Sequence, residues 1–315
     1  MDHNNAVYGV DVAKRNLVIA EYDAQTLVVV PNLAESIAAW LAQLARGATV
    51  AMEATGAYHQ VLAHLAHTAG MQVYVLNPQT LKHYAAAIGQ RGKTDGCDAR
   101  MIARYAVHEQ AKLRRWLPPA PAADRLSQLL ERRHTVVSTR QTLAQSLAVP
   151  MLKAPRQSLL ANVDRILRRL EILIRHEIAR LPGMTALYER LKGIVGIGPV
   201  VAAQLVAVFS TLNFAKADSF IAYTGLDPRP DDSGDRRGRR RLSKRGPPLL
   251  RCLLYNAGMA AANSRLLKPV YKQLRARGLQ TTEAIVILAR KIARIAFALY
   301  KSGHCFDAQK HLKTA

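Results

Sequence analysis

Cysteine is scarce in this sequence. Its 315 residues include three cysteines, Cys97, Cys252 and Cys305, which lie far apart and form no CxxC pair. Three distant cysteines supply neither a disulfide framework nor the paired thiolates of a structural zinc site. We therefore expect a protein of a reducing compartment whose fold depends on neither.

Long apolar runs and common nucleotide- and zinc-binding patterns are also missing. The apolar segment 284–300 is interrupted by Arg290, Lys291 and Arg294, whereas a membrane-spanning helix needs about 20 apolar residues in a row. The opening residues, MDHNNAVYG, lack the charged and then apolar pattern of a secretory signal. No GxxxxGK[ST] loop occurs, and the histidines are not spaced as zinc ligands. These absences argue against a membrane protein, a P-loop NTPase and a zinc hydrolase.

Acidic residues are outnumbered two to one by basic ones. There are 45 Lys and Arg against 22 Asp and Glu, which gives a net charge of +23. Such an excess favours a polyanionic partner, and nucleic acid is the most common one. The length suits about two domains of roughly 100–200 residues each.

The first third of the chain alternates apolar runs with helical patterns. Runs at 7–10, 17–22 and 27–30 predict a meander of three strands, and runs at 49–52 and 71–76 alternate with helical stretches. This order predicts an α/β domain with some parallel pairing. Asp11 and Glu53 each follow an apolar run, and ligands in open α/β sheets bind at the carboxyl ends of strands. Strands also simply end in polar residues, so neither acid decides the question alone.

The stretch KTDGCDAR at 93–100 contributes two more carboxylates. Asp95 and Asp98 are three residues apart at the start of a predicted helix and would share one of its faces. The ordinary interpretation is an N-cap at Asp95 and a first-turn acid at Asp98. The alternative is a divalent cation bound between them. With Asp11 and Glu53, the four carboxylates would suit two Mg²⁺ ions about 3.5–4 Å apart in phosphoryl transfer.

A proline-rich segment, PPAP at 118–121, separates this domain from two long helical patterns. Leu, Ile and Val recur at helical spacing over 124–149 and 158–181, with breaks expected at Pro150 and Pro155. Two basic amphipathic helices of this kind fit an antiparallel hairpin or an intermolecular coiled coil. We expect them to form a structural or oligomerising arm.

The last part holds two candidates for nucleic-acid binding. The segment 191–207, LKGIVGIGPVVAAQLVA, is similar to a helix-hairpin-helix, whose tight turn presents backbone N–H groups to phosphate. A purely structural turn between helices fits it nearly as well. The segment 225–247, GLDPRPDDSGDRRGRRRLSKRGP, predicts a loop, and its basic density favours phosphate contacts.

Across the whole chain, the residues expected to contact nucleic acid are Lys93, Arg100, Gly196, Gly198, Arg236, Arg237, Arg239, Arg240, Arg241, Lys244 and Arg245.

Ser233 stands at the front of this basic segment and is followed by Gly234. A Ser-Gly pair in a loop usually forms only a turn. Here the hydroxyl is close in sequence to side chains able to bind a phosphate that it would attack. No Ser-His-Asp or Ser-x-x-Lys partner set is evident to activate it.

Several motifs, in order along nearly the whole chain, resemble transposases of the insertion-sequence-110 family and their Piv-type DNA invertase relatives. These motifs are VYGVDVAK at 7–14, MEATGAY at 52–58, VLNP at 75–78, KTDGCDARMIA at 93–103, IVGIGPVVAAQL at 194–205, and FIAYTGLDPRPDDSG and RLSKRGPPLLRCLLY within 220–255. The pair Pro247-Pro248 departs from the family pattern, in which a helix start more often continues.

The resemblance implies an α/β RuvC-like (RNase H-type) domain at 1–117, a helical coiled-coil arm at 118–182 and an all-α transposase domain at 183–315. It implies a DEDD metal site at Asp11, Glu53, Asp95 and Asp98, and a nucleophilic serine at Ser233. It further implies a site shared within a dimer or tetramer, and a noncoding bridge-type guide RNA that pairs with donor and target DNA. We therefore predict a DNA recombinase of an insertion sequence, acting in the bacterial cytoplasm at the nucleoid.

Two other functions stay open at this point. One is a metal-dependent Holliday-junction-type endonuclease that uses only the four carboxylates, with Ser233 as a turn residue. The other is a nucleic-acid-binding protein without catalysis. The effects of Ser233→Ala and of added Mg²⁺ on strand cutting distinguish the three.

Overall fold

The computed structural model describes residues 6–56, 58–90, 92, 94–229 and 241–309, and the backbone alone at 232–233 and 236–237. The chain divides into two compact units, Met1–Pro118 and Pro119–Ala315. In the described ranges, no helix combines the length and the apolar character needed to cross a membrane.

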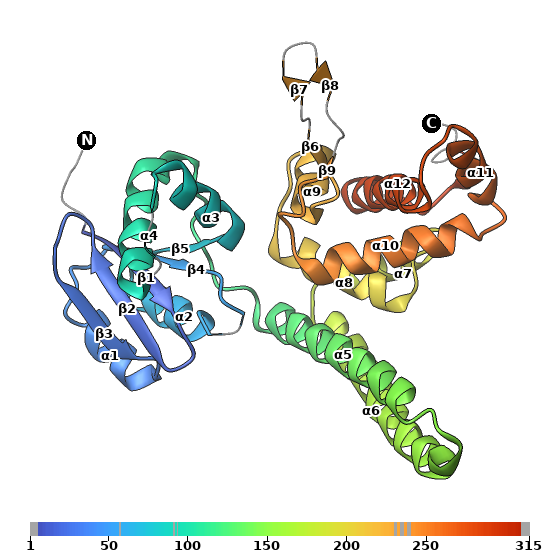
Figure 1. Ribbon diagram of the computed structural model, residues 1–315, viewed down its shortest axis with the longest axis horizontal. Helices are drawn as coiled ribbons and strands as arrows, with labels where there is room; N and C mark the ends of the chain where they lie inside the picture. The colour runs from blue at the N-terminus through green and yellow to red at the C-terminus, as the bar shows by residue number, and fades with distance from the viewer. Residues whose placement is uncertain are drawn as a thin grey trace. The chain divides into compact units, whose positions relative to one another are not determined.

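The first unit is built on a mixed five-stranded sheet (Figure 1). β1 (Val7–Val12), β2 (Asn16–Glu21) and β3 (Leu27–Pro31) form the expected antiparallel meander. β4 (Thr49–Glu53) pairs in parallel with β1, and β5 (Gln72–Leu76) pairs in parallel with β4. The order β3-β2-β1-β4-β5 places β1 in the centre. The prediction of an α/β domain with some parallel pairing is confirmed.

Helices cover both faces of this sheet. One face is packed by α1 (Ala34–Leu41) and α2 (Gln60–Thr68), and the other by α3 (Pro78–Ala87) and α4 (Asp95–Glu109). Strand side chains alternate between the faces. Val10 and Met52 lie in the apolar cluster beneath α1 and α2, whereas Ala51 lies in the cluster with Ile102 of α4. Residues 9 and 11 of β1, and 51 and 53 of β4, therefore face α4.

The second unit begins with two long helices, α5 (Pro121–Ser146) and α6 (Lys153–Ala179). Three arginines of α5 pair with acids of α6, and the residue numbers fall on one helix as they rise on the other: Arg125–Glu177, Arg133–Glu171 and Arg140–Asp164. The helices are therefore antiparallel. The predicted helix break at Pro155 is wrong. This proline lies in the first turn of α6, where its missing N–H has no acceptor to lose.

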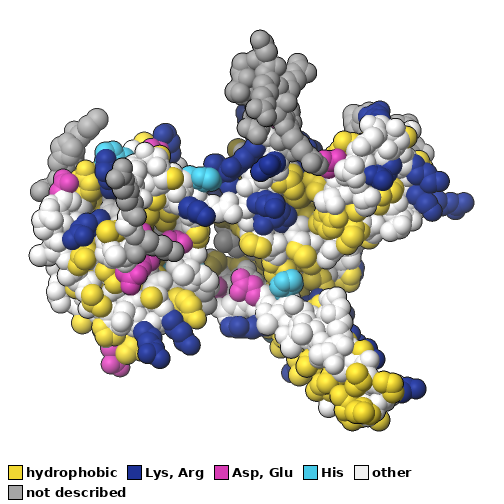
Figure 2. All heavy atoms as spheres, viewed as in Figure 1, with side chains coloured by type: hydrophobic (Ala, Val, Ile, Leu, Met, Phe, Trp, Pro, Cys, Tyr) yellow, Lys and Arg dark blue, Asp and Glu magenta, His cyan; other side chains and the backbone are white. Residues whose placement is uncertain are grey.

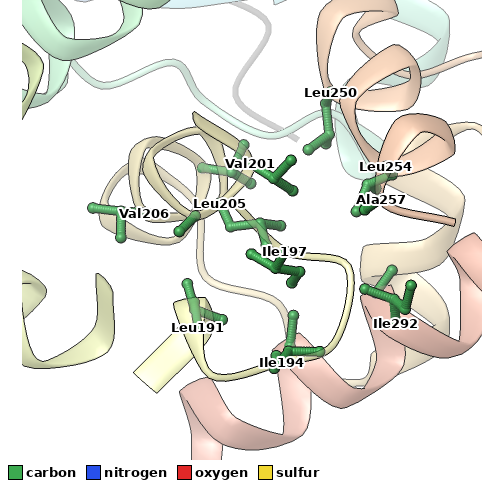
Figure 3. Packing of buried hydrophobic residues seen from close by; sticks show 14 of the residues in the cluster. Leu191, Ile194, Ile197, Val201, Leu205, Val206, Leu250, Leu254, Ala257 and Ile292 are labelled. Carbon is green, nitrogen blue, oxygen red and sulfur yellow. The ribbon is translucent and has the colours of Figure 1, made fainter. Parts of the chain in front are cut away.

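The other helices surround α8 (Pro199–Thr211), in which Val201 through Phe209 are all buried. Figure 3 shows Leu191 and Ile197 among Leu205, Leu254 and Ile292 in this core. The start of α5 and the end of α6 pack in the same core. The predicted domain boundary at 182 stays a prediction. The surrounding helices are α7 (Met184–Lys192), α9 (Ala217–Thr224), α10 (Pro248–Ala262), α11 (Lys268–Ala276) and α12 (Thr281–Ser302).

The segment 225–247 is not the open loop that its composition predicts. β6 (Pro228–Arg229) pairs antiparallel with β9 (Arg241–Leu242), and β7 (Asp232–Ser233) pairs antiparallel with β8 (Arg236–Arg237). Strands of two residues leave no alternating apolar pattern in a sequence, so only the turn-forming residues were visible there.

Candidate functional site

Asp11 and Glu53 lie on neighbouring parallel strands. Gly9 of β1 pairs with Ala51 of β4, and Val10 pairs with Met52. One step further along the two strands come Asp11 and Glu53. Partners in a parallel ladder point to the same face of the sheet, and here that is the face covered by α4. Asp11 lies inside β1, which runs on to Val12, so the predicted end of this strand at Val10 is wrong.

Gly9 allows α4 to rest directly on β1. A Cβ atom at Gly9 would lie 2.2 Å from the carbonyl oxygen of Ala99 and 2.3 Å from the backbone nitrogen of Ala103. Gly9 and Asp11 point to the same face, and Asp95 stands one helical turn before Ala99. The contact therefore brings the first turn of α4 towards Asp11.

Thr94 is the N-cap of α4. Its hydroxyl oxygen accepts a hydrogen bond from the backbone N–H of Cys97 at 3.3 Å, and its carbonyl oxygen accepts one from the N–H of Asp98 at 3.0 Å. The interpretation of Asp95 as the N-cap is therefore wrong, because Asp95 is the first residue of the helix. Its carboxylate is left exposed at the start of α4.

Asp98 is held by a residue that the sequence did not single out. The side-chain amide of Gln90 donates a hydrogen bond to Oδ1 of Asp98 at 3.1 Å and another to the carbonyl oxygen of Gly92 at 3.2 Å. Gln90 follows α3, so this contact ties the connection between α3 and α4 to the acid. A lone glutamine between two helices carries no pattern that would reveal this role.

The four acids form one electrostatic cluster centred on Asp11. Its burial, together with the negative charges of Asp95, Asp98 and Glu53, raises the pKa of Asp11 from 3.8 to about 6. A backbone hydrogen bond at Val12 acts in the opposite direction. The structure thus places near one another four carboxylates that span residues 11 to 98 of the sequence and that come from β1, β4 and α4.

The cluster is not a preformed coordination shell. In the part of the chain that the structure describes, no three His, Cys, Asp or Glu side chains come close enough together to hold a metal ion. The chemistry of the donors nevertheless fits a divalent cation, because Mg²⁺ prefers carboxylate oxygens. A bound cation would also relieve the repulsion that raises the pKa of Asp11.

The expected nucleic-acid contacts in the first unit have different outcomes. Lys93 lies outside the described residues. Arg100 is exposed and its Nη2 donates a hydrogen bond to the carbonyl oxygen of Gln25 at 2.7 Å. It is therefore held at the connection between β2 and β3.

The turn before α8 favours a structural interpretation for one of its two glycines. Gly196 has a φ of +91°, and a Cβ atom there would lie 2.4 Å from the carbonyl oxygen of Ala257 in α10. Close packing therefore explains this glycine. Gly198 is the exposed N-cap of α8 and has open space around it, so a phosphate contact there stays a prediction.

Ser233 lies on β7, opposite Arg236 of β8, in the second unit. Arg241, Lys244 and Arg245 are exposed at the base of this hairpin, while Arg239 and Arg240 lie outside the described residues. Of Arg236 and Arg237 only the strand backbone is described.

The base of the hairpin is closed by a second serine that the sequence did not single out. The hydroxyl of Ser243 donates a hydrogen bond to the carboxylate of Asp227, and its backbone N–H bonds the Asp227 carbonyl oxygen at 2.9 Å. The N–H of Lys244 bonds the carbonyl oxygen of Gly225 at 3.1 Å. Asp227 directly precedes β6 and Ser243 directly follows β9, so these bonds hold together the ends of the paired strands β6 and β9.

Comparison with known proteins gives matches in both units. Residues 8–154 match the DEDD transposase domain of IS110 elements, and residues 188–272 match transposases of the IS116/IS110/IS902 family. The pilin gene-inverting proteins of Moraxella lacunata and Moraxella bovis are each 27% identical over 266 residues, with 82% of each chain covered. A probable family 20 transposase of Pseudomonas aeruginosa is 27% identical over 306 residues, with 82% of this chain and 85% of the relative covered.

These matches, on an α/β sheet that gathers four carboxylates, define a DNA-rearranging enzyme. The two matched segments span most of the chain, in the order of the sequence motifs. The chain belongs to the IS110 family of transposases, which confirms the resemblance that its motifs indicated.

Proposed function

We propose that this protein cuts and rejoins the DNA of an insertion sequence through Ser233, with divalent metal held by Asp11, Glu53, Asp95 and Asp98. Our main support is the convergence of the four carboxylates on Asp11, whose pKa is raised to about 6. Like charges gathered around a half-buried acid destabilise a fold unless a cation offsets them. A purely structural role gives no reason for this arrangement.

The acids are held by two kinds of support. Asp11 and Glu53 project from the hydrogen-bonded strands β1 and β4, while Asp98 is oriented by Gln90 and by the cap that Thr94 forms. These four acids would hold divalent metal, which would stabilise the negative charge that develops in phosphoryl transfer.

The chemical step that we assign to Ser233 is a transesterification. Its Oγ forms a bond to the phosphorus of a DNA phosphodiester while the bond from phosphorus to the leaving strand's oxygen breaks. The serine loses its hydroxyl proton and the leaving oxygen takes one up, so protons balance. Attack by the hydroxyl of another strand end reverses the step, restores the serine and joins the strands, so no external energy source is needed. The arginines of the 225–247 segment hold the DNA backbone.

The partners that we propose rest on the family resemblance and on charge. We infer from the resemblance that the site is shared within a homo-oligomer, a dimer or tetramer. A guide RNA that pairs with donor and target DNA rests on the family resemblance, and the net charge of +23 suits both nucleic acids.

Trapping of a covalent intermediate tests the serine. Protein is incubated with DNA and Mg²⁺, denatured, and assayed for a protein–DNA adduct. We expect an adduct with the native protein, none with Ser233→Ala, and an unchanged amount with Ser219→Ala, which changes an exposed serine on α9. Asp11→Asn should abolish the adduct, whereas Glu131→Gln, at an exposed acid on α5, should not. An adduct that persists in Ser233→Ala contradicts the assignment.

A nuclease that uses the acids alone is the second candidate. All four acids lie within the first unit, which therefore carries a complete carboxylate set without Ser233. In that case Ser233→Ala cuts DNA normally and Asp11→Asn does not.

The guide RNA is tested in the same preparations. RNA that copurifies with the protein is sequenced, and DNA binding is expected to be lost when this RNA is removed.

A further inference from the structure

The exposed side of α11 carries a basic surface to which the active site gives no role. Lys268, Lys272 and Arg275 recur at i, i+4 and i+7 and so share one helix face, with Arg265 just before the helix and Arg277 just after it. All five side chains are exposed. Figure 2 shows Lys and Arg side chains gathered over α11, at the right-hand edge of the view. We call Arg265, Lys268, Lys272 and Arg275 the α11 basic face; Arg277 is left out because it lies about half a turn round the helix from Lys268.

The opposite side of α11 is fixed to the core of the second unit. Leu267 and Leu274 are buried, and Val270 and Tyr271 pack against the same apolar cluster. The helix is therefore held in place, and Lys268 and Arg275 stand about 10 Å apart along its axis, from a rise of about 1.5 Å per residue. A helix that binds a membrane surface needs a free apolar side, which α11 does not have.

The charge of this face is not compensated. The sequence contains no Asp or Glu between Asp235 and Glu283. Within the described ranges, none of its four residues forms an ion pair with a carboxylate, whereas Arg125, Arg133 and Arg140 of α5 all do. Arg275 donates a hydrogen bond to the carbonyl oxygen of Leu279, which orients its guanidinium group. Clustered unpaired positive charge attracts a polyanion.

We propose that the α11 basic face binds the phosphate backbone of duplex DNA, as a surface separate from the 225–247 segment. Duplex DNA is the partner because the chain belongs to a family of enzymes that rearrange DNA. The proposal rests on that membership and not on Ser233. Lys and Arg along one helix edge contact phosphates and read no bases. The affinity of this face for DNA is therefore independent of the base sequence and falls as the salt concentration rises.

The test compares two variants that lose equal charge. One carries Arg265→Gln, Lys268→Gln and Lys272→Gln; Arg275 is left in place because of its bond to Leu279. The control carries Arg132→Gln, Arg165→Gln and Arg169→Gln, at exposed arginines of α5 and α6. Fluorescence anisotropy with duplex DNA and with an RNA hairpin is recorded from about 50 to 200 mM salt, where phosphate contacts weaken steeply. Thermal melting of each variant checks its fold.

We expect the α11 variant to bind duplex DNA with a salt slope reduced by about 2 to 3, at roughly 0.9 per lost contact, while the control keeps the native slope. Equal slopes for the two variants would overturn the proposal, and so would an effect confined to the RNA hairpin. The proposed function is tested by the covalent adduct and the α11 basic face by the salt slope, so the failure of one can be told from the failure of the other. An adduct that persists in Ser233→Ala would remove the serine mechanism and leave the α11 basic face standing.

Discussion

Gly9 decides how closely α4 approaches the central strand. With no Cβ at this position, the backbone of Ala99 and Ala103 lies against β1, and the acids in the first turn of α4 lie near enough to raise the pKa of Asp11. The neighbours that a side chain would meet are backbone atoms, which cannot rotate away. Any side chain at position 9 therefore has to move the helix that carries Asp95 and Asp98.

We expect Gly9→Ala to lower the free energy of unfolding by about 3 kcal/mol, the upper end for an overpacked core, and to abolish strand transfer. Gly92→Ala makes the same chemical change where the added Cβ meets no atom within 4 Å. Its free energy of unfolding should stay within about 1 kcal/mol of the native value. Urea denaturation measures both. Equal stability of the two variants would show that α4 does not rest on Gly9.

Asp11 itself makes the metal-free protein less stable as pH rises. Its pKa is about 6 in the fold against 3.8 for a free side chain, so folding favours the protonated form. The penalty is absent below about pH 4, grows as pH rises, and is complete above about pH 6. In EDTA, Asp11→Asn should melt at a higher temperature than the native protein at pH 8, and this gain should disappear at pH 4. A gain of equal size at both values, in melts followed by circular dichroism, would contradict the raised pKa of Asp11, which burial and then the charges of the other three acids cause.

At the scale of elements, the α5–α6 pair is aligned by charge. Arg133 donates hydrogen bonds from Nε and Nη2 to Oε1 of Glu171 at 3.1 and 2.7 Å. Arg125–Glu177 and Arg140–Asp164 repeat this pairing towards each end of the helices. A shift of one helix turn would place these arginines beside other residues, so the three pairs together favour the observed register.

A double-mutant cycle on Arg133 and Glu171 tests this alignment. We expect Arg133→Glu and Glu171→Arg each to destabilise the protein, and the double variant to recover about 0.2–1 kcal/mol, as partly exposed pairs do. Arg132 is exposed and adjacent, so Arg132→Glu combined with Glu171→Arg provides the control and should recover nothing. Additive effects in the first cycle would show that the pair does not align the helices.

At the scale of the whole molecule, the clustered acidic residues and the long basic stretch lie in different units. The acid cluster lies in the first unit, whereas the second unit holds the long stretch from 236 to 282 that has no acidic residue. Under the proposed function, the acid cluster binds divalent metal and the basic stretch binds DNA. Chemistry and binding should therefore respond to different solution conditions.

Removal of divalent ions by EDTA should abolish adduct formation and leave DNA binding nearly unchanged. Raising salt from about 50 to 200 mM should instead weaken binding by roughly 10³-fold or more, as for proteins with several phosphate contacts. A gel-shift assay and the adduct assay, run on the same samples, measure the two effects. Loss of binding in EDTA at constant ionic strength would contradict this separation.

Many elements of the fold were predictable from local patterns. Apolar runs located β1 to β5 close to their observed bounds, and helical spacing located α5 and α6. Short strands such as β7 and β8 were not predictable, because two residues carry no period. The start of α6 before Pro155 was not predictable either. A proline predicts a helix break unless it is known to lie in the first turn of a helix.

The sequence alone determined the family, the basic character of the chain and the identity of the four acids as candidates, because motifs, charge and strand ends are local properties. Only the tertiary structure decided that the other three acids lie near enough to Asp11 to raise its pKa. Asp11 and Glu53 become neighbours through the register of β1 with β4, and Asp95 and Asp98 join them through the contact of α4 with Gly9. Gln90 became visible in the same way, since its bond to Asp98 depends on where two helices place their connection. Pairing and packing join distant segments, and no local pattern records which segments will meet.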